Sequence, residues 1–235
     1  MKVIFLNCWY AKEKKNLFKF LQDEMSGTDI FCFVEVNPTN FQDFGNTLSE
    51  FQGYYSTYDL FTTSNCIYGQ AIFVKNKFKV IENGKFKVYK NLKNDVGFIQ
   101  HMSLKIGNRN LYIANVHGKT RPGHKLDTPI RIKQSEKIIK FFDSSTAPVI
   151  IGGDFNLFNK TKSIALFELN GYRDLIKEFK IKDTRGKINK KIYQSSNIQY
   201  YADYCFVSRD VKVKTFTVPD PEVSDHLPLI LEFEI

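Results

Sequence analysis

One short segment in the second half of the chain joins an apolar strand to residues that could do chemistry. Residues 147–156 read APVIIGGDFN, so an apolar run stops on two glycines and then presents an acid and an amide. The glycines free the backbone where a central, buried strand ends. Asp154 and Asn156 would then project from the carboxyl end of that strand, where open α/β folds place their sites. A polar turn after a strand is the alternative reading of the same two residues.

Glu35 is the second residue that points to chemistry. It interrupts the apolar run IFCFVEV at residues 30–36, where a carboxylate buried without a partner would be strongly destabilising. A hard divalent cation would remove that penalty, because carboxylate and amide oxygens are the ligands that Mg²⁺ prefers. An acid at an exposed strand end is the alternative.

Histidines supply the remaining candidates. Asp225 and His226 precede the last apolar run, and Asp203 within the run YADY is a candidate to orient the His226 ring. His117 closes another strand pattern, and Asn7 closes the first one. The other two histidines are interpreted as structural or incidental: His101, inside a strand pattern, and His124, in a polar loop.

The elements that must position these residues follow from hydrophobic periodicity. We predict strands over residues 2–6, 30–36, 70–75, 78–81, 86–89, 98–106, 110–116, 149–151, 200–207, 211–218 and 229–234. Helices are expected over 13–25, 38–51, 129–142 and 162–169, whereas residues 173–196 fit no element. The helix starts rest on Asn37-Pro38 and Thr128-Pro129, and Gly107-Asn108 predicts a hairpin turn. The polar candidates therefore gather at or beside strand ends.

Composition narrows the class of protein. The chain has 235 residues, of which 43% are hydrophobic, and no linker or repeat divides it, so we predict a single domain over residues 1–235. It contains no apolar run of ~20 residues and no secretory leader pattern. Its cysteines lie far apart, which excludes a local zinc knuckle or a disulfide framework: Cys8, Cys32, Cys66 and Cys205. We therefore expect reduced thiols and a cytoplasmic location.

The formal net charge of +9 favours polyanionic partners. Seven lysines lie between Lys75 and Lys93 against one acid, and a lysine-rich edge that keeps the protein soluble is the favoured explanation for them. A second basic cluster follows: Lys177, Lys180, Lys182, Arg185, Lys187, Lys190 and Lys191. The sequence indicates no protein partner, and we expect a monomer.

Taken together and in order, with Asn7 leading, the motifs resemble those of the endonuclease/exonuclease/phosphatase family. The matching pieces are FVE at 33–35, HG at 117–118, GGDFN at 152–156, YADY at 201–204 and SDHLP at 224–228. The resemblance runs from Asn7 to the C-terminus. It implies a four-layer α/β sandwich, in which two mostly antiparallel sheets pack face to face with helices outside. It also implies a phosphoesterase that depends on Mg²⁺ or Mn²⁺.

The resemblance also implies roles for individual residues. Glu35 would be the principal metal ligand, with Asn7 and Asp225 close to the ion or its waters. Asp154 would align or deprotonate the attacking water, and Asn156 would bind a phosphate oxygen and help hold Asp154. The phosphate would be contacted by two histidines: His226, held by Asp203, and His117. The general base stays open between Asp154 and the pair of His226 with Asp203, and we favour Asp154. Two positions depart from the family pattern, namely Val34 in place of a glutamine and Tyr201 in place of a basic residue.

The substrate is the least determined feature. Basic residues after His117 could bind a second phosphate: Lys119, Arg121, His124, Lys125 and Arg131. Trp9 could stack on a base or sugar. As substrate-binding residues we select Lys119, Arg121, Arg131 and Trp9. A nuclease or DNA-repair phosphodiesterase is the preferred hypothesis. A phosphatase or phosphodiesterase for a small molecule or lipid headgroup explains the motifs equally well, and a non-catalytic binding protein is disfavoured.

Overall fold

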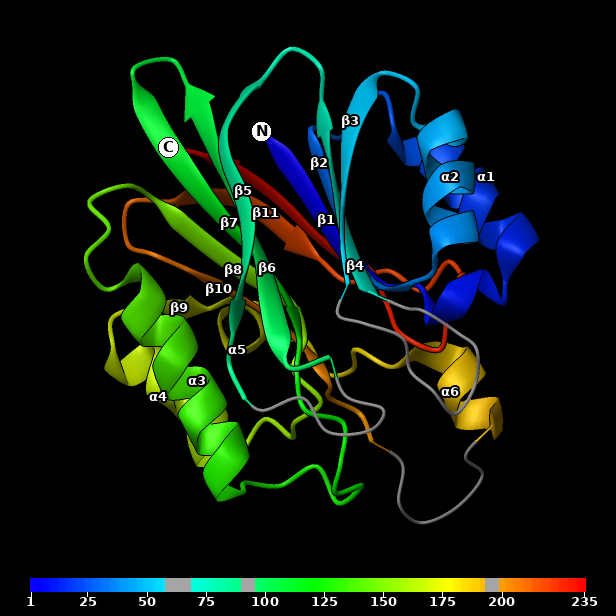
Figure 1. Cartoon of the computed structure of the whole chain (residues 1–235). Coiled ribbons are helices and arrows are strands. Elements are labelled where there is room, and N and C mark those ends of the chain that lie inside the picture. Colours follow the sequence, from blue (N-terminus) through cyan, green and yellow to red (C-terminus); the bar gives the residue numbers. More distant parts are fainter. Residues whose placement is uncertain (58–68, 90–95, 193–198) are drawn as a thin grey trace.

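Two six-stranded sheets dominate the computed structural model, which describes residues 1–57, 69–89, 96–192 and 199–235 (Figure 1). The first sheet has the spatial order β11 (Lys212–Thr217), β12 (Leu229–Glu234), β1 (Lys2–Asn7), β2 (Ile30–Val36), β4 (Gly69–Lys75) and β3 (Phe51–Ser56). The second has the order β5 (Lys79–Lys87), β6 (Phe98–Ile106), β7 (Arg109–His117), β8 (Val149–Asp154), β10 (Asp203–Val207) and β9 (Arg173–Asp174). Each sheet holds one parallel pair, β1 with β2 and β7 with β8, and the other pairs are antiparallel.

Helices cover the outer faces of both sheets (Figure 1). Beside the first sheet lie α1 (Lys14–Glu24) and α2 (Pro38–Thr47), and beside the second lie α3 (Pro129–Phe142) and α4 (Lys162–Leu169). Three shorter helices are η1 (Trp9–Ala11), α5 (Leu175–Glu178) and α6 (Gly186–Ile192). This is the four-layer α/β sandwich predicted from the sequence. In the part of the chain that the structure describes, no helix is both long and apolar enough to cross a bilayer.

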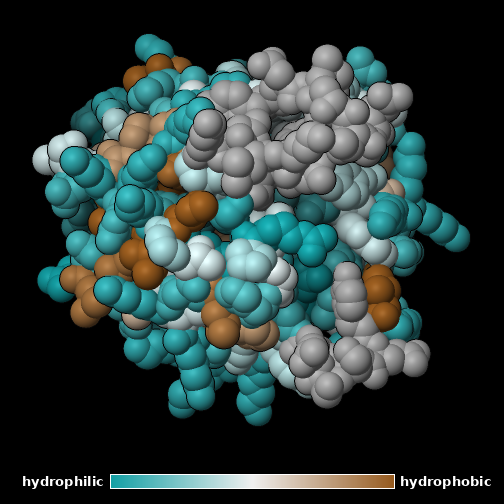
Figure 2. All heavy atoms as spheres, turned by 60° about the horizontal axis from the view of Figure 1, so that its bottom comes forward, coloured by the Kyte–Doolittle hydropathy of each residue, from teal (hydrophilic) through white to brown (hydrophobic). Residues whose placement is uncertain are grey.

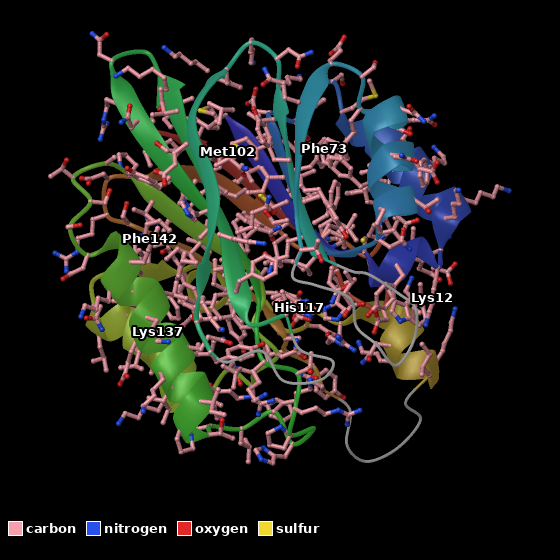
Figure 3. The ribbon with its side chains drawn as sticks, viewed as in Figure 1. Lys12, Phe73, Met102, His117, Lys137 and Phe142 are labelled. Atoms are coloured by element: carbon pink, nitrogen blue, oxygen red, sulfur yellow. The ribbon has the colours of Figure 1, made fainter. Side chains whose placement is uncertain are left out.

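Two apolar clusters hold the layers together. The larger one, to which Met102 of β6 belongs, fills the space between the sheets, and it extends under α3 to include Phe142 (Figure 3). The smaller one lies between the first sheet and the helices α1 and α2. Its buried rings include Phe33, Phe44 and Phe73, and the Phe33 and Phe44 centroids are 4.9 Å apart. Complete burial of each such ring contributes about 1.5–3 kcal/mol.

The boundaries of several elements correct the predictions. The second helix ends at Thr47, and Phe51 begins β3 instead of closing the helix. The two short strands expected at 78–81 and 86–89 form one strand, β5, because a register shift between Val80 and Glu82 lets pairing with β6 continue. The strand expected over 200–207 begins only at Asp203. Residues 173–196 contain β9, α5 and α6 within the described range.

The topology explains why one end of the sandwich collects the polar residues. The parallel strands β1, β2, β7 and β8 all finish at this end, which lies lowest in Figure 1, and β10 and β12 begin there. In the second sheet, Asp154 is the register partner of His117 on one side and of Asp203 on the other. Figure 3 shows His117 at this end of β7, and Figure 2, which turns this end forward, shows a mainly hydrophilic centre. The chain direction alone therefore brings residues distant in sequence into one site.

Candidate active site

The two glycines at the end of β8 allow close packing behind the site. A Cβ on Gly152 would lie 2.7 Å from the Phe5 ring of the opposite sheet. A Cβ on Gly153 would lie 2.3 Å from the Val116 carbonyl oxygen, and Gly153 has a φ of 126°, which only glycine adopts easily. The glycines are thus required where the strand leaves the core and presents Asp154.

Asp154 lies at the centre of the site and is only 1% exposed. Its carboxylate accepts hydrogen bonds from Asn7 Nδ2 at 3.0 Å, from the Asn156 backbone N–H at 2.8 Å and from Asn156 Nδ2 at 3.0 Å. Burial raises the pKa of Asp154, but the surrounding positive charges, first that of His226, hold it below its ordinary value. The side chain is therefore both fixed in orientation and ionised at neutral pH.

His226 faces Asp154 with one nitrogen and Asp203 with the other. Its Nδ1 lies 2.8 Å from Asp203 Oδ2, and its Nε2 lies 3.7 Å from Asp154 Oδ2. Thr184 Oγ1 supports Asp203 by accepting its backbone N–H at 3.2 Å. Burial and Arg185 lower the pKa of His226, but three carboxylates, led by Asp203, raise it further, to about 9. Burial raises the pKa of Asp203 to about 6, against the opposing effect of His226. The Nε2 atom thus faces the site, where Arg185 Nη1 adjoins it and Asn7 Nδ2 lies 3.3 Å away.

Glu35 reaches the site through a distortion of β2. The register with β4 shifts between Val34 and Val36, and Glu35 has a φ of 58°, in the left-handed region. Its side chain is 16% exposed, and its carboxylate accepts no hydrogen bond from any residue that the structure describes. His117 Nε2 lies 3.7 Å from Glu35 Oε1 and 4.0 Å from Asp154 Oδ2. The bulge thus turns a carboxylate without donors toward Asp154.

A divalent cation fits this arrangement. One ligand atom each from Glu35, His117 and Asp154 lie within 4.8 Å of one another, which is the spacing of a shared metal ion. The Glu35 carboxylate, which lacks protein donors, is the oxygen ligand that such an ion would satisfy. Of the two other predicted ligands, Asn7 uses its Oδ1 to accept the Trp9 N–H at 3.0 Å, and Asp225 accepts a hydrogen bond from Arg185 at 2.9 Å.

Arg185 is the principal site residue that the sequence reasoning did not select. Its side chain is buried, and Nη2 donates to Asp225 Oδ2 and to Asn189 Oδ1, both at 2.9 Å. Its Nη1 directly adjoins His226 Nε2, and its Nε finds no hydrogen-bond partner among the described residues. The only sequence signal for this residue was its place in the second basic cluster, within the segment that showed no periodicity.

The loop after His117 depends on Arg131, which we had selected to bind substrate. Arg131 is completely buried, and its guanidinium donates to four backbone carbonyls, those of Lys119, Thr120, Pro122 and Leu126. The charge therefore shapes the loop from within. Charge in the sequence does not separate this role from that of a substrate ligand.

In this loop, the ammonium group of Lys125 reaches the catalytic residues. Its Nζ donates to the Thr120 carbonyl at 3.0 Å and to Asn156 Oδ1, and burial lowers its pKa to about 8. Lys119 is buried, with its Nζ 5.1 Å from the Tyr89 ring centroid, and Arg121 is exposed.

The remaining candidates lie at the margin of the site or outside it. Trp9 is half-buried beside Asn7, and the Lys12 ammonium lies 4.0 Å from its ring centroid. His101 packs against Phe141 with a centroid distance of 4.8 Å, and burial lowers its pKa, as suits a structural histidine. His124 accepts the Leu126 N–H at 3.0 Å. Three of the cysteines are buried and free; Cys66, Lys90 and Lys93 lie outside the described residues.

An α/β sandwich with acids and histidines at one end defines the class of DNase I-like phosphoesterases. A family model for the endonuclease/exonuclease/phosphatase family matches residues 4–226. The chain therefore belongs to this family, as its motifs indicated, and the protein is a hydrolase of phosphate esters. In sequence, no curated protein matches the chain.

Solved structures extend the likeness in fold. The catalytic domain of human Nocturnin with bound sulfate is 20% identical over 100% of this chain and 94% of that chain, with a TM-score of 0.75. TDP2 from Caenorhabditis elegans is 19% identical over 100% of this chain and 74% of that chain, with a TM-score of 0.74. A mannosyl-6-phosphatase from Bacteroides thetaiotaomicron is 18% identical over 100% of both chains, with a TM-score of 0.70. At these identities the likeness concerns the fold.

Proposed function

We propose that this protein is a Mg²⁺- or Mn²⁺-dependent phosphodiester hydrolase that acts on nucleic acid in the cytoplasm. The observation that carries the proposal is the Asp154 carboxylate. Three donor groups fix it, and it lies between the donor nitrogen of His226 and the unsatisfied carboxylate of Glu35. This arrangement suits attack by a water molecule on a phosphate held between positive groups.

Glu35 would be the main protein ligand of the divalent ion, with Asp154 and His117 within reach. When bound, the ion would supply Lewis acidity and neutralise negative charge on the phosphate. Val34 is buried at the position where the family usually has a glutamine, so the residue before Glu35 provides no polar support for this carboxylate.

Asp154 is the base in this proposal. Its low pKa keeps it ionised, and its three donors aim it, so it can align a water molecule and accept the proton. The pKa of His226, raised to about 9, favours the protonated ring at neutral pH, and in that form the ring donates a proton rather than accepts one. Instead, its Nε2 donates to a non-bridging phosphate oxygen, and Asp203 maintains the orientation of the ring. The structure thus supports the choice of Asp154 that the sequence left open.

Arg185 and Lys125 complete the phosphate site. Arg185 Nη1 directly adjoins His226 Nε2, so an oxyanion bound beside this pair would be stabilised by the guanidinium and by the histidine ring in its protonated form. Lys125 holds Asn156 from the other side of Asp154. A phosphate bound here would contact donors from both sides of the catalytic carboxylate.

The test is a panel of substrates with Mg²⁺: plasmid and oligonucleotide DNA, RNA, inositol phosphates, sphingomyelin, sugar phosphates and nucleotides. Glu35→Ala serves as the blank. The proposal predicts metal-dependent cleavage of a nucleic acid that the blank lacks. Cleavage confined to a small-molecule or lipid phosphate would instead establish the alternative function, and full activity of Glu35→Ala would exclude the proposed metal site.

A further inference from the structure

An open groove lies beside the active site, between α4, α5 and the segment before β10. Its volume is about 870 Å³, and its walls include Asn159, Lys182 and Tyr201. Each of these residues lies two or three positions along the chain from a site residue, namely Asn156, Arg185 and Asp203. Because an extended residue spans at most ~3.6 Å, the groove lies within ~11 Å of the site along each of these three segments. Groove and active site are therefore neighbours that the same three segments connect.

The groove is strongly basic. Five exposed lysines from two separate segments line it: Lys160, Lys162, Lys177, Lys180 and Lys182. Of the two acids in the lining, Glu168 is engaged by Lys177 at 2.8 Å, and Asp174 caps α5 by accepting the Ile176 N–H at 2.9 Å. The other four lysines form no ion pair with any residue in the described part of the chain.

This pattern separates the groove from the rest of the second basic cluster. Lys187 and Lys191 both pair with Glu222 at 3.4 Å, and Lys190 pairs with Asp183. Each of those three lysines is thus paired with a nearby acid, whereas four of the five lysines in the groove are left for a ligand. The division follows the fold, since the paired lysines belong to α6 and the unpaired ones lie on or beside α4 and α5.

The floor of the groove is apolar. Ile164, Ile176 and Ile181 line it, and the Tyr201 ring is held beside them because its hydroxyl donates to the Ile181 carbonyl at 3.2 Å. A ligand for such a groove combines several anionic groups with flat or apolar bodies. A nucleic-acid strand has this chemistry, because its bases stack on aromatic rings while its phosphates contact lysines. A lipid surface would need the apolar side chains to protrude, and here they form the floor of a concavity.

We propose that this groove binds the part of a single nucleic-acid strand that flanks the scissile phosphate. The proposal rests on the proposed function, because it names the substrate class of the same active site. Tyr201 stands where the family often has a basic residue, and here the lysines of the groove supply the positive charge.

The experiment compares two double variants of the full chain. Lys160→Glu with Lys182→Glu reverses charge in the groove, and Lys79→Glu with Lys105→Glu makes the same change at the other end of the second sheet. Binding of a labelled twelve-nucleotide single strand is measured in EDTA at several salt concentrations. Hydrolysis of the strand and of bis(4-nitrophenyl) phosphate, which is too small to reach the groove, is measured with Mg²⁺.

We expect the groove variant to bind the strand at least tenfold more weakly and to lose about 1.4 from its salt slope, since each phosphate contact on a single strand contributes ~0.7. Its KM for the strand should rise by a similar factor, while hydrolysis of the small diester stays within twofold of wild type. Equal losses in both variants, no loss in either, or binding of anionic vesicles in place of the strand would overturn the proposal. Failure of the wild type to cleave any phosphodiester would refute the proposed function, and the strand-binding measurement would still decide the groove.

Discussion

The two carboxylates at the centre of the site, Glu35 and Asp154, are held in opposite ways. Asp154 ends a strand whose register with both neighbours is unbroken, is 1% exposed and accepts three hydrogen bonds from the protein. Glu35 sits on a bulge with left-handed backbone, is 16% exposed at its side chain, and accepts no hydrogen bond from the described residues. One carboxylate is satisfied by the protein itself, and the other is presented for an external partner.

This difference separates their functions. A carboxylate whose orientation is set before substrate arrives is suited to position a water and take its proton. A carboxylate without donors, placed by a strained backbone, is suited to a cation that replaces the missing hydrogen bonds. The two residues should therefore respond differently to substitution, to metal concentration and to backbone change.

The largest effect is expected at Asp154. Asp154→Ala removes the base and leaves the donors of Asn7 and Asn156 without an acceptor, so kcat should fall about 10³–10⁴-fold. Steady-state kinetics over a range of Mg²⁺ concentrations measures this, with circular dichroism as the control for folding. Excess Mg²⁺ should not restore the activity of this variant. Recovery of activity at high Mg²⁺ would instead show that Asp154 is chiefly a metal ligand.

Glu35→Gln should lose less activity than Asp154→Ala and should regain part of that activity when metal is added. The amide keeps the shape of the side chain but removes its charge, so we expect a 10–100-fold weaker response to metal, partly restored at high Mg²⁺. A second readout is thermal unfolding, in which Mg²⁺ should raise the Tm of wild type far more than that of the variant. Equal rises in Tm for both proteins would show that Glu35 does not hold the ion.

The sequence located these two carboxylates and several of their neighbours, but not all of them. The apolar runs before Glu35 and Asp154 predict strand ends. Because parallel strands end at the same edge of a sheet, a common site for the two carboxylates could be inferred. The position of Arg185 could not be inferred, because its segment lacks hydrophobic periodicity and its place beside His226 depends on how α6 packs. Arg131 shows the converse, since a basic residue in a site loop was selected for substrate and instead binds carbonyls from inside.

A smaller effect separates the two sides of the site by pH. Lys125 holds the Asp154 side through Asn156, and its pKa is lowered to about 8 by burial, so its positive charge is present below that pH and lost above it. Activity should decline above about pH 8 in wild type. In Lys125→Arg the guanidinium stays charged, so the alkaline decline should move to higher pH. Lys137→Arg on the exposed face of α3 is the matched control and should keep the wild-type profile (Figure 3). A decline unchanged in Lys125→Arg would assign it to another group.

The smallest effect concerns the backbone, and it tests the contrast between the two carboxylates without any activity. Glu35 has a φ of 58°, where a side chain costs about 1–2 kcal/mol that glycine does not incur. In urea unfolding without metal, Glu35→Gly should therefore be more stable than Glu35→Ala by about 1 kcal/mol. Asp154 has no left-handed φ, so the order of stability should reverse at this position. There Asp154→Ala should be more stable than Asp154→Gly by ~1 kcal/mol. If alanine is the more stable residue at both positions, the bulge at Glu35 stores no strain, and its carboxylate is placed by the sheet as simply as that of Asp154.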